Sequence, residues 1–295
     1  MLLLIFWYSI ILITVIIILF FVWYRERYAL KVKKYSICLA NLPEGLAGFT
    51  VLHLSDLHGK RFGKAQQKLL YLIRQQQFDM IAITGDLVNK FNPDLSPAVE
   101  LIEQLPDRPV YFVPGNHEWT TGFRQREKLV QMGVRILDNR AERVGEDEGY
   151  LWVLGVDDPH TGRDRLDEAL KAAGEEPGAL RTPGASPAPR VLLAHSPNIF
   201  PEAAAAKVDV VLAGHTHGGQ VRFPLVGAVF TPGQGLFPRW NYGRYQSGPS
   251  TMIINPGLGE SDLPIRLNIK PEIVLVTLLP ADRNQERKII YGRGC

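Results

Sequence analysis

The sequence predicts an α/β fold: a layered β-sheet with flanking helices, preceded by one N-terminal transmembrane helix. Two observations predict the layers. Short apolar runs alternate with polar amphipathic segments from residue 50 onward, and hydrophobic residues make up 46% of the 295 residues, enough for a substantial core. A third observation predicts the helix, because residues 2–24 are apolar apart from Ser9 and Thr14 and carry no charge.

The N-terminal apolar segment is long enough to cross a bilayer. A helix over residues 2–24 spans roughly 34 Å, against a hydrocarbon core of about 30 Å. Aromatic rings favour the membrane interface, and four lie near the ends of the segment: Trp7, Tyr8, Trp23 and Tyr24. A cleavable signal peptide would need a preceding basic residue, a shorter apolar run and a small-residue cleavage site, and none of these is clear. We therefore expect an uncleaved anchor over residues 1–24.

A basic segment follows the anchor. Residues 25–34 carry five positive charges and one negative charge, so a net charge of +3 for the chain leaves a near-neutral remainder. A near-neutral body argues against a nucleic-acid binder. No Lys or Arg precedes the apolar run, and basic residues beside a membrane segment stay preferentially in the cytoplasm. We predict a single-pass protein of the cell (plasma) membrane with its main domain in the cytoplasm, residues 25–47 being a basic juxtamembrane segment and linker.

Strands and helices should alternate along the rest of the chain, which predicts a sheet covered on both faces. We expect strands at residues 50–55, 80–84, 110–113, 150–156, 191–194, 208–213, 251–254 and 272–278. We expect helices at residues 64–77, 98–105 and 123–132, with a shorter one near 165–172. Residues 174–190 are rich in Gly, Pro and Ala and should form a surface loop. One domain is expected over residues 48–280, followed by a tail at 281–295.

Residues suited to metal binding and catalysis follow five of the expected strands. Each group begins where an apolar run stops: Asp56 and His58; Asp86; Asn116, His117 and Glu118; His195; His215 and His217. In an open α/β sheet, ligands bind beyond the carboxyl ends of the strands, so the five groups should converge on one crevice. Five of the seven histidines of the chain lie in these groups, which a random distribution would not produce.

The side chains in these groups indicate a metal centre. Carboxylate, imidazole and amide oxygen suit Mn²⁺, Fe or Zn²⁺, and two cysteines are too few for a cysteine-rich zinc site. The candidate groups are too numerous for one ion. Two ions about 3.5–4 Å apart can share a bridging carboxylate, hold a phosphate and lower the pKa of water between them. We expect two divalent metal ions as cofactors.

In order and spacing, these groups resemble the motifs of the calcineurin-like metallophosphoesterases, over roughly residues 48–280. The glycines after His217 and the segment from Gly257 to Glu272 resemble the bacterial, often membrane-tethered subgroup that includes UDP-2,3-diacylglucosamine hydrolase-like proteins. The resemblance implies a layered metallophosphoesterase fold. It also implies metal-dependent hydrolysis of a phosphodiester or pyrophosphate, a lipid-linked phosphate being one candidate substrate.

The resemblance also implies a role for each site residue. The first ion would be held by Asp56, His58 and His217, the second by Asn116, His195 and His215, with Asp86 bridging them. His117 would contact the phosphate and protonate or stabilise the leaving oxygen. Many phosphatases of this superfamily carry an Asp three residues after the bridging Asp, which orients the catalytic His. Here that position is Asn89, whose amide supplies no negative charge, and Glu118 is the other candidate for that role.

Two further functions stay open at this point. The chain could be a tethered phosphodiesterase that acts on a soluble substrate, or a catalytically silent metal-binding scaffold. A silent scaffold would usually lose ligands, and all seven are present here together with His117. A metallo-β-lactamase-like hydrolase would need an early His-x-His-x-Asp-His run, which does not occur.

Three features lie outside these motifs: two histidines and one aromatic, arginine-containing stretch. His53 and His160 should be structural or rim residues. The stretch from Val221 to Tyr245 combines six aromatic residues with three arginines. It is either a long loop packed on the sheet or an apolar, cationic rim suited to an amphiphilic phosphate near a bilayer.

Overall fold

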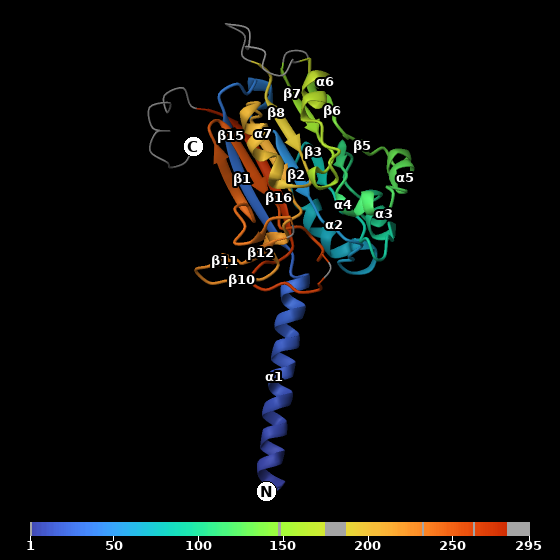
Figure 1. Ribbon diagram of the computed structural model, residues 1–295. Helices are drawn as coiled ribbons and strands as arrows, with labels where there is room; N and C mark the ends of the chain where they lie inside the picture. Colours follow the sequence, from blue (N-terminus) through green and yellow to red (C-terminus); the bar gives the residue numbers. More distant parts are fainter. Residues whose placement is uncertain (1, 147–148, 175–186, 232, 262, 282–295) are drawn as a thin grey trace.

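Two mixed β-sheets pack face to face in the computed structural model of the chain, and helices cover their outer faces (Figure 1). The structure describes residues 2–146, 149–174, 187–231, 233–261 and 263–281. The layered α/β architecture predicted from the alternating apolar segments is confirmed. The long N-terminal helix projects away from the domain (Figure 1).

The first sheet has the strand order β1-β16-β2-β3-β4-β5. Its strands are β1 (Lys31–Leu39), β2 (Thr50–Leu54), β3 (Met80–Thr84), β4 (Val110–Val113), β5 (Arg135–Ile136) and β16 (Glu272–Pro280). Neighbours from β2 to β5 are parallel, whereas β16 runs antiparallel to β2 and parallel to β1. The carboxyl ends of β2, β3 and β4 therefore lie at one edge.

The second sheet has the order β14-β15-β9-β8-β7-β6. Its strands are β6 (Arg140–Glu146), β7 (Gly149–Gly155), β8 (Arg190–Leu193), β9 (Val210–Ala213), β14 (Gly243–Ser247) and β15 (Ser250–Ile254). The four central strands are parallel. Two small hairpins lie outside both sheets, formed by β10 (Arg222–Phe223) with β11 (Gly227–Ala228) and β12 (Phe230–Thr231) with β13 (Gly235–Leu236).

Alternate residues of each central strand face different layers, which explains why these strands read as continuous apolar runs. Met80 and Ala82 of β3 pack between the two sheets, whereas Ile81 and Ile83 pack against the helices of the first sheet. The helices are α2 (Gln67–Arg74), α3 (Ser96–Ile102), α4 (Asn116–Thr120), α5 (Arg126–Gln131), α6 (Leu166–Ala172) and α7 (Phe200–Ala205). Short 3₁₀ turns are η1 (Glu44–Leu46), η2 (Lys64–Gln66), η3 (Pro159–Thr161), η4 (Pro197–Ile199) and η5 (His217–Gly219).

The structure differs from the sequence expectations around the anchor. Helix α1 covers Leu2–Tyr28 and so continues past residue 24. Strand β1 occupies part of the segment expected to be a linker. Its lysines are compatible with a strand because β1 is an edge strand, and only the far end, at Ile37 and Leu39, is buried. Most of the loop expected at residues 174–190, and nearly all of the tail, lies outside the described residues.

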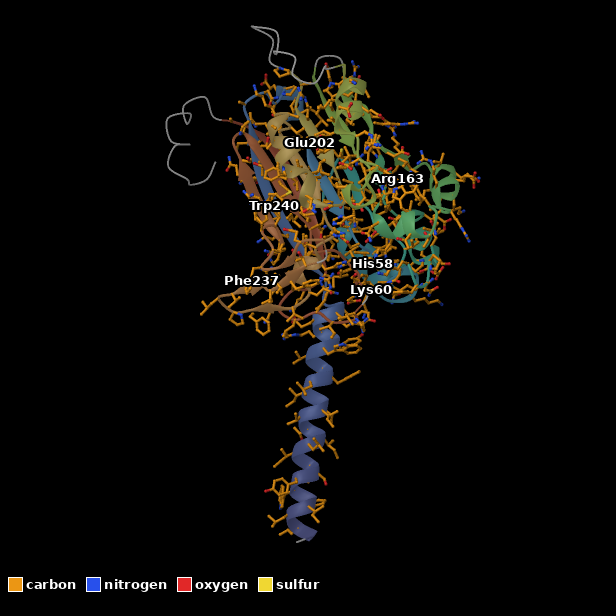
Figure 2. All side chains as sticks on the ribbon, viewed as in Figure 1. His58, Lys60, Arg163, Glu202, Phe237 and Trp240 are labelled. Carbon is orange, nitrogen blue, oxygen red and sulfur yellow. The ribbon has the colours of Figure 1, made fainter. Side chains whose placement is uncertain are left out.

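Helix α1 is fixed to the domain by its last two turns. The Arg27 guanidinium donates to both carboxylate oxygens of Glu260 at 3.2 and 3.3 Å, and the Lys60 ammonium donates to the same carboxylate at 2.5 Å. The indole N–H of Trp23 donates to the carbonyl of Pro264 at 3.1 Å. His58 and Lys60 lie at the end of the domain from which α1 emerges (Figure 2). The anchor thus meets the domain beside the loops that carry the motifs.

Candidate metal centre

All seven expected ligands and His117 follow the carboxyl ends of central strands and come together in one buried cluster. Five of them have positive φ values between 50° and 68°: Asp56, His58, Asp86, His215 and His217. Such backbone conformations are uncommon for residues other than glycine and concentrate at functional sites. The turn after each strand therefore directs the side chains into the cluster at the expense of local backbone strain.

Close approach between the loops requires a glycine beside Asp86. Gly85 has φ of +79°, and a Cβ atom there would lie 2.5 Å from Nδ1 of His195 and 2.8 Å from Cα of Gly115. Glycine adopts positive φ at no steric cost, and it has no Cβ atom to fill the space between the loops. Gly85 thus allows the loop after β3 to contact the loops after β4 and β8.

A first set of donor atoms comes from the loops after β2 and β9. Nε2 of His58 lies 3.2 Å from Nε2 of His217. Oδ1 of Asp56 lies 3.8 Å from the first nitrogen and 3.6 Å from the second. The two imidazoles and the carboxylate therefore face a common point.

A second set surrounds Nε2 of His195. This atom lies 3.0 Å from Nδ1 of His215, 3.2 Å from Oδ1 of Asn116 and 3.3 Å from Oδ2 of Asp86. Nδ1 of His195 is 2.8 Å from the carbonyl of Thr84, which can only accept, so Nδ1 carries the proton. The lone pair of Nε2 consequently points at the other three donors.

The carboxylate of Asp86 links the two sets. Its Oδ2 lies 3.5 Å from Nε2 of His58 in the first set and 3.3 Å from Nε2 of His195 in the second. Ligands around one ion at bond lengths of about 2.0–2.2 Å are themselves about 3.0–3.5 Å apart. The spacing of the donors, and their chemistry of imidazole, carboxylate and amide oxygen, therefore fit divalent metal ions.

The Asp86 carboxylate and the imidazoles around it shift one another's pKa values. Burial raises the pKa of Asp86, but His195, His58 and His117 outweigh burial and hold the pKa well below its usual value. Burial lowers the pKa of His195, but the Asp86 carboxylate outweighs it and raises this pKa well above its usual value. These two shifts show that the Asp86 carboxylate favours a positive partner beside it. Burial instead lowers the pKa of His215 and of His217, which keeps these two rings neutral, as metal ligands must be.

His117 lies beside the Asp86 carboxylate, with Nε2 3.9 Å from Oδ2. Its Nδ1 accepts a hydrogen bond from the backbone N–H of Lys90 at 3.0 Å. Burial lowers the pKa of His117, so the ring is neutral near pH 7 and its one proton lies on Nε2, toward the donor cluster. The side-chain oxygen of Asn89 instead accepts the backbone N–H of Phe91.

Glu118 has a role that the sequence did not reveal. Its buried carboxylate accepts the backbone N–H groups of Asp86, Leu87 and Gly115, each at 2.8 Å. Glu118 thus joins the loops after β3 and β4 and fixes the backbone of Asp86. The only sequence signal was a carboxylate next to His117, and its hydrogen bonds to main-chain groups could not be inferred from that.

The two remaining histidines differ in position. Nε2 of His53 lies 2.8 Å from the Thr84 hydroxyl in the core, so His53 is structural. His160 lies at the rim, its ring centroid 4.3 Å from that of His215 and its Nδ1 3.4 Å from Asp158. Both positions agree with the structural or rim roles expected for them.

A family model for calcineurin-like phosphoesterases matches residues 49–219, which is more than half of the chain. The chain belongs to the calcineurin-like phosphoesterase family. It is therefore a metal-dependent phosphoesterase, and the resemblance noted from its motifs is confirmed. The match begins at β2 and ends at η5, so it contains all seven expected ligands and His117.

Curated relatives carry corresponding names. The chain is 30% identical over 270 residues to a zebrafish (Danio rerio) transmembrane protein with a metallophosphoesterase domain, a match that covers 85% of this chain and 58% of that protein. It is 29% identical over 257 residues to the phosphodiesterase YaeI of Escherichia coli, covering 82% of this chain and 86% of the relative. Among solved structures, Haemophilus influenzae NAD nucleotidase is similar, with a TM-score of 0.47, 14% identity, and coverage of 72% of this chain and 46% of that one.

The apolar α1 and the transmembrane name of the zebrafish relative together indicate that this phosphoesterase associates with a membrane. Among the described residues, α1 is the single helix that is both long enough and apolar enough to span a bilayer. Its apolar residues are exposed along its length.

Proposed function

We propose that this phosphoesterase uses two divalent metal ions, Mn²⁺, Zn²⁺ or Fe, to hydrolyse a phosphodiester or pyrophosphate. The observation that carries the proposal is the position of Asp86, whose Oδ2 lies within 3.5 Å of the ligand nitrogens of both donor sets. A carboxylate so placed is suited to bridge two ions. The first ion would be held by Asp56, His58 and His217, and the second by Asn116, His195 and His215.

The residues of the cluster would have different roles in hydrolysis. When bound, two divalent ions polarise the phosphoryl group and make water a stronger nucleophile. Glu118 holds the Asp86 backbone in place, and Gly85 keeps the loops close enough to share one substrate. His117 directs its Nε2–H toward the cluster, where it can donate to the leaving oxygen as that oxygen gains charge.

The substrate we favour is a lipid-linked phosphate at the cytoplasmic surface of the cell membrane. Support comes from the docking of α1 next to the site through Arg27, Lys60 and Glu260. The basic residues that follow the apolar part of α1 favour a cytoplasmic position for the domain and attract anionic headgroups. A tethered enzyme with a soluble substrate would need no such proximity between anchor and site.

One experiment on the purified full chain tests both parts of the proposal. Metal content is measured after loading with Mn²⁺, Zn²⁺ or Fe²⁺, and each form is assayed with phosphomonoester, phosphodiester and pyrophosphate substrates, with and without an acyl chain. We expect two ions per chain and faster turnover of the acylated diester or pyrophosphate. Asp86→Ala should lose both the second ion and turnover. One ion per chain in the active enzyme would refute the dimetal site, and equal rates with and without the acyl chain would refute the lipid preference.

A further inference from the structure

Exposed large apolar side chains of the domain are concentrated in three segments at one end. Outside α1, twelve such side chains are exposed among the described residues, and nine of them lie in these segments. We call the nine the apolar rim: Phe223, Leu225 and Val226; Phe230, Leu236 and Phe237; Leu263, Ile265 and Leu267. Leu225, at the tip of the first hairpin, is fully exposed. Contiguous apolar surface of this kind marks an interaction site rather than ordinary protein surface.

Hydrogen bonds connect the apolar rim directly to the membrane anchor. The Trp23 indole of α1 donates to Pro264, which lies between Leu263 and Ile265. The backbone N–H of Arg222, at the base of the first hairpin, donates to the carbonyl of Leu267 at 3.0 Å. The N–H of Phe237 donates to the carbonyl of Val229 at 2.7 Å, which extends the second hairpin by one pair, and Val229 follows directly after β11 of the first hairpin.

The position of the anchor sets the level of the apolar rim relative to a bilayer. Trp23 and Tyr24 end the apolar part of α1, and such rings lie at the boundary between hydrocarbon and headgroups. Pro264 contacts the helix at this level. The small hairpins lie beside the emerging end of α1, and Phe237 is at the same end of the domain (Figures 1 and 2). A bilayer crossed by α1 would therefore meet the apolar rim.

Cationic side chains accompany the apolar ones. Arg25 of α1 is largely exposed, and Arg239, which follows the second hairpin, is also exposed. Apolar side chains that enter the interface, next to cations that pair with anionic headgroups, are the pattern of interfacial membrane binding.

We propose that the apolar rim inserts into the interfacial region of the same bilayer that α1 crosses, as a second membrane contact. A second copy of the chain is the competing occupant. It would have to displace lipid from around the end of α1, whereas a bilayer is already present at that level. The proposal does not depend on the chemistry of the metal centre.

Photocrosslinking in lipid nanodiscs tests this contact. The full chain is prepared with p-benzoylphenylalanine in place of Leu225 or Phe237, and reconstituted with phosphatidylcholine and phosphatidylglycerol. Probes at Tyr24 and at the exposed Val130 of α5 are the positive and negative controls. Mass spectrometry after irradiation should find lipid adducts at positions 225 and 237, as at 24, and none above background at 130. Adduct yields at 225 and 237 equal to that at 130, or crosslinks between two chains in place of lipid adducts, would overturn the proposal.

Negative charge introduced into the apolar rim supplies a second test. The probe is placed at Phe230, and Leu225→Asp is combined with Phe237→Asp, two changes at exposed positions outside the core. The variant should lose the lipid adduct at position 230, whereas Val130→Asp, an apolar-to-acid change at another exposed position, should retain it. Undiminished adduct formation in the double variant would contradict insertion through these side chains.

Discussion

The backbone N–H of Lys90 donates to Nδ1 of His117 at 3.0 Å, and this one bond determines which nitrogen of the ring faces the metal ligands with a proton. If a carboxylate stood where the Lys90 N–H is, it would accept a hydrogen bond from Nδ1–H. Nε2 would then carry no proton and could act as a base. A main-chain donor has the opposite effect, because it occupies the Nδ1 lone pair. This hydrogen bond supports the role proposed for His117, which is to donate a proton rather than to remove one.

Replacing His117 should reduce turnover without removing metal. His117→Ala is expected to keep the metal content of the wild type, because the ring is not needed by either donor set. Turnover should fall by about 10²–10⁴-fold, the usual contribution of a general acid or base. Metal analysis and steady-state rates on the same preparations measure both effects. A His117→Ala enzyme with near wild-type turnover and full metal content would exclude the proposed role.

Glu118 should matter for stability as well as for metal binding. Glu118→Ala leaves the buried backbone N–H groups of Asp86, Leu87, Val88 and Gly115 without this acceptor and should lower the free energy of unfolding by more than about 2 kcal/mol. Glu118→Gln keeps one acceptor oxygen for two of these groups but turns a donating NH2 toward the other two, so it should recover only part of the loss. Glu127→Ala, an exposed acid-to-alanine change in α5, should cost less than about 0.5 kcal/mol. Urea unfolding of the three variants gives the comparison, and equal stability of Glu118→Ala and Glu127→Ala would refute the role of Glu118 in joining the loops.

Glu272 should make stability depend on pH in a defined direction. Burial raises the pKa of Glu272 above 4.5, and the Tyr242 hydroxyl donates to its carboxylate at 3.0 Å. Because the folded chain then holds the proton more tightly than the unfolded chain, the Glu272 contribution is fully present below about pH 4.5. It is lost as pH rises through the folded-state pKa.

The comparison of wild type with Glu272→Gln isolates this effect. The unfolding free energy of wild type minus that of the variant should decrease as pH rises from about 4 to about 8. A Glu272→Gln difference that is flat, or that increases with pH, would contradict the raised pKa.

The side of the membrane can be read with reporters fused after Cys295. Alkaline phosphatase is active only outside the cytoplasm, and green fluorescent protein fluoresces on the cytoplasmic side. The basic residues after the apolar segment predict fluorescence without phosphatase activity. The reverse pattern would place the domain outside and exclude cytoplasmic lipid-linked phosphates as substrates.

The central strands and the position of the site were predictable for one physical reason. Strands that are buried on both faces have uninterrupted apolar sequences, and the carboxyl ends of parallel strands lie at the same edge of the sheet. The polar residue that ends each run, such as Asp56 after β2 or Asp86 after β3, therefore marks the site directly. The family resemblance added the pairing of these residues into two donor sets.

The contacts that complete the site were not predictable. The donor to His117 is a backbone group, which no side-chain pattern records. The ion pair of Arg27 with Glu260 joins positions 233 residues apart, and its two members carry no local signal. Strand β1 was missed because its lysines suggest a solvated segment, whereas pairing with β16 makes it the edge of a sheet.

The short connection between α1 and β1 fixes the height of the enzyme above the bilayer. Only Ala29 and Leu30 separate Tyr28 from Lys31. The salt bridge of Arg27 with Glu260, and the hydrogen bond from the Lys60 ammonium to the carbonyl of Arg27, hold the helix end against the domain. This short connection keeps the domain close to the membrane surface, so its metal centre is not placed to bind a phosphate far from that surface. For the lipid-linked substrate proposed above, this fixed height would select a phosphate by its distance from the hydrocarbon as well as by its chemistry. Lengthening the connection by a few flexible residues would turn a fixed-height enzyme into one that samples the nearby solution.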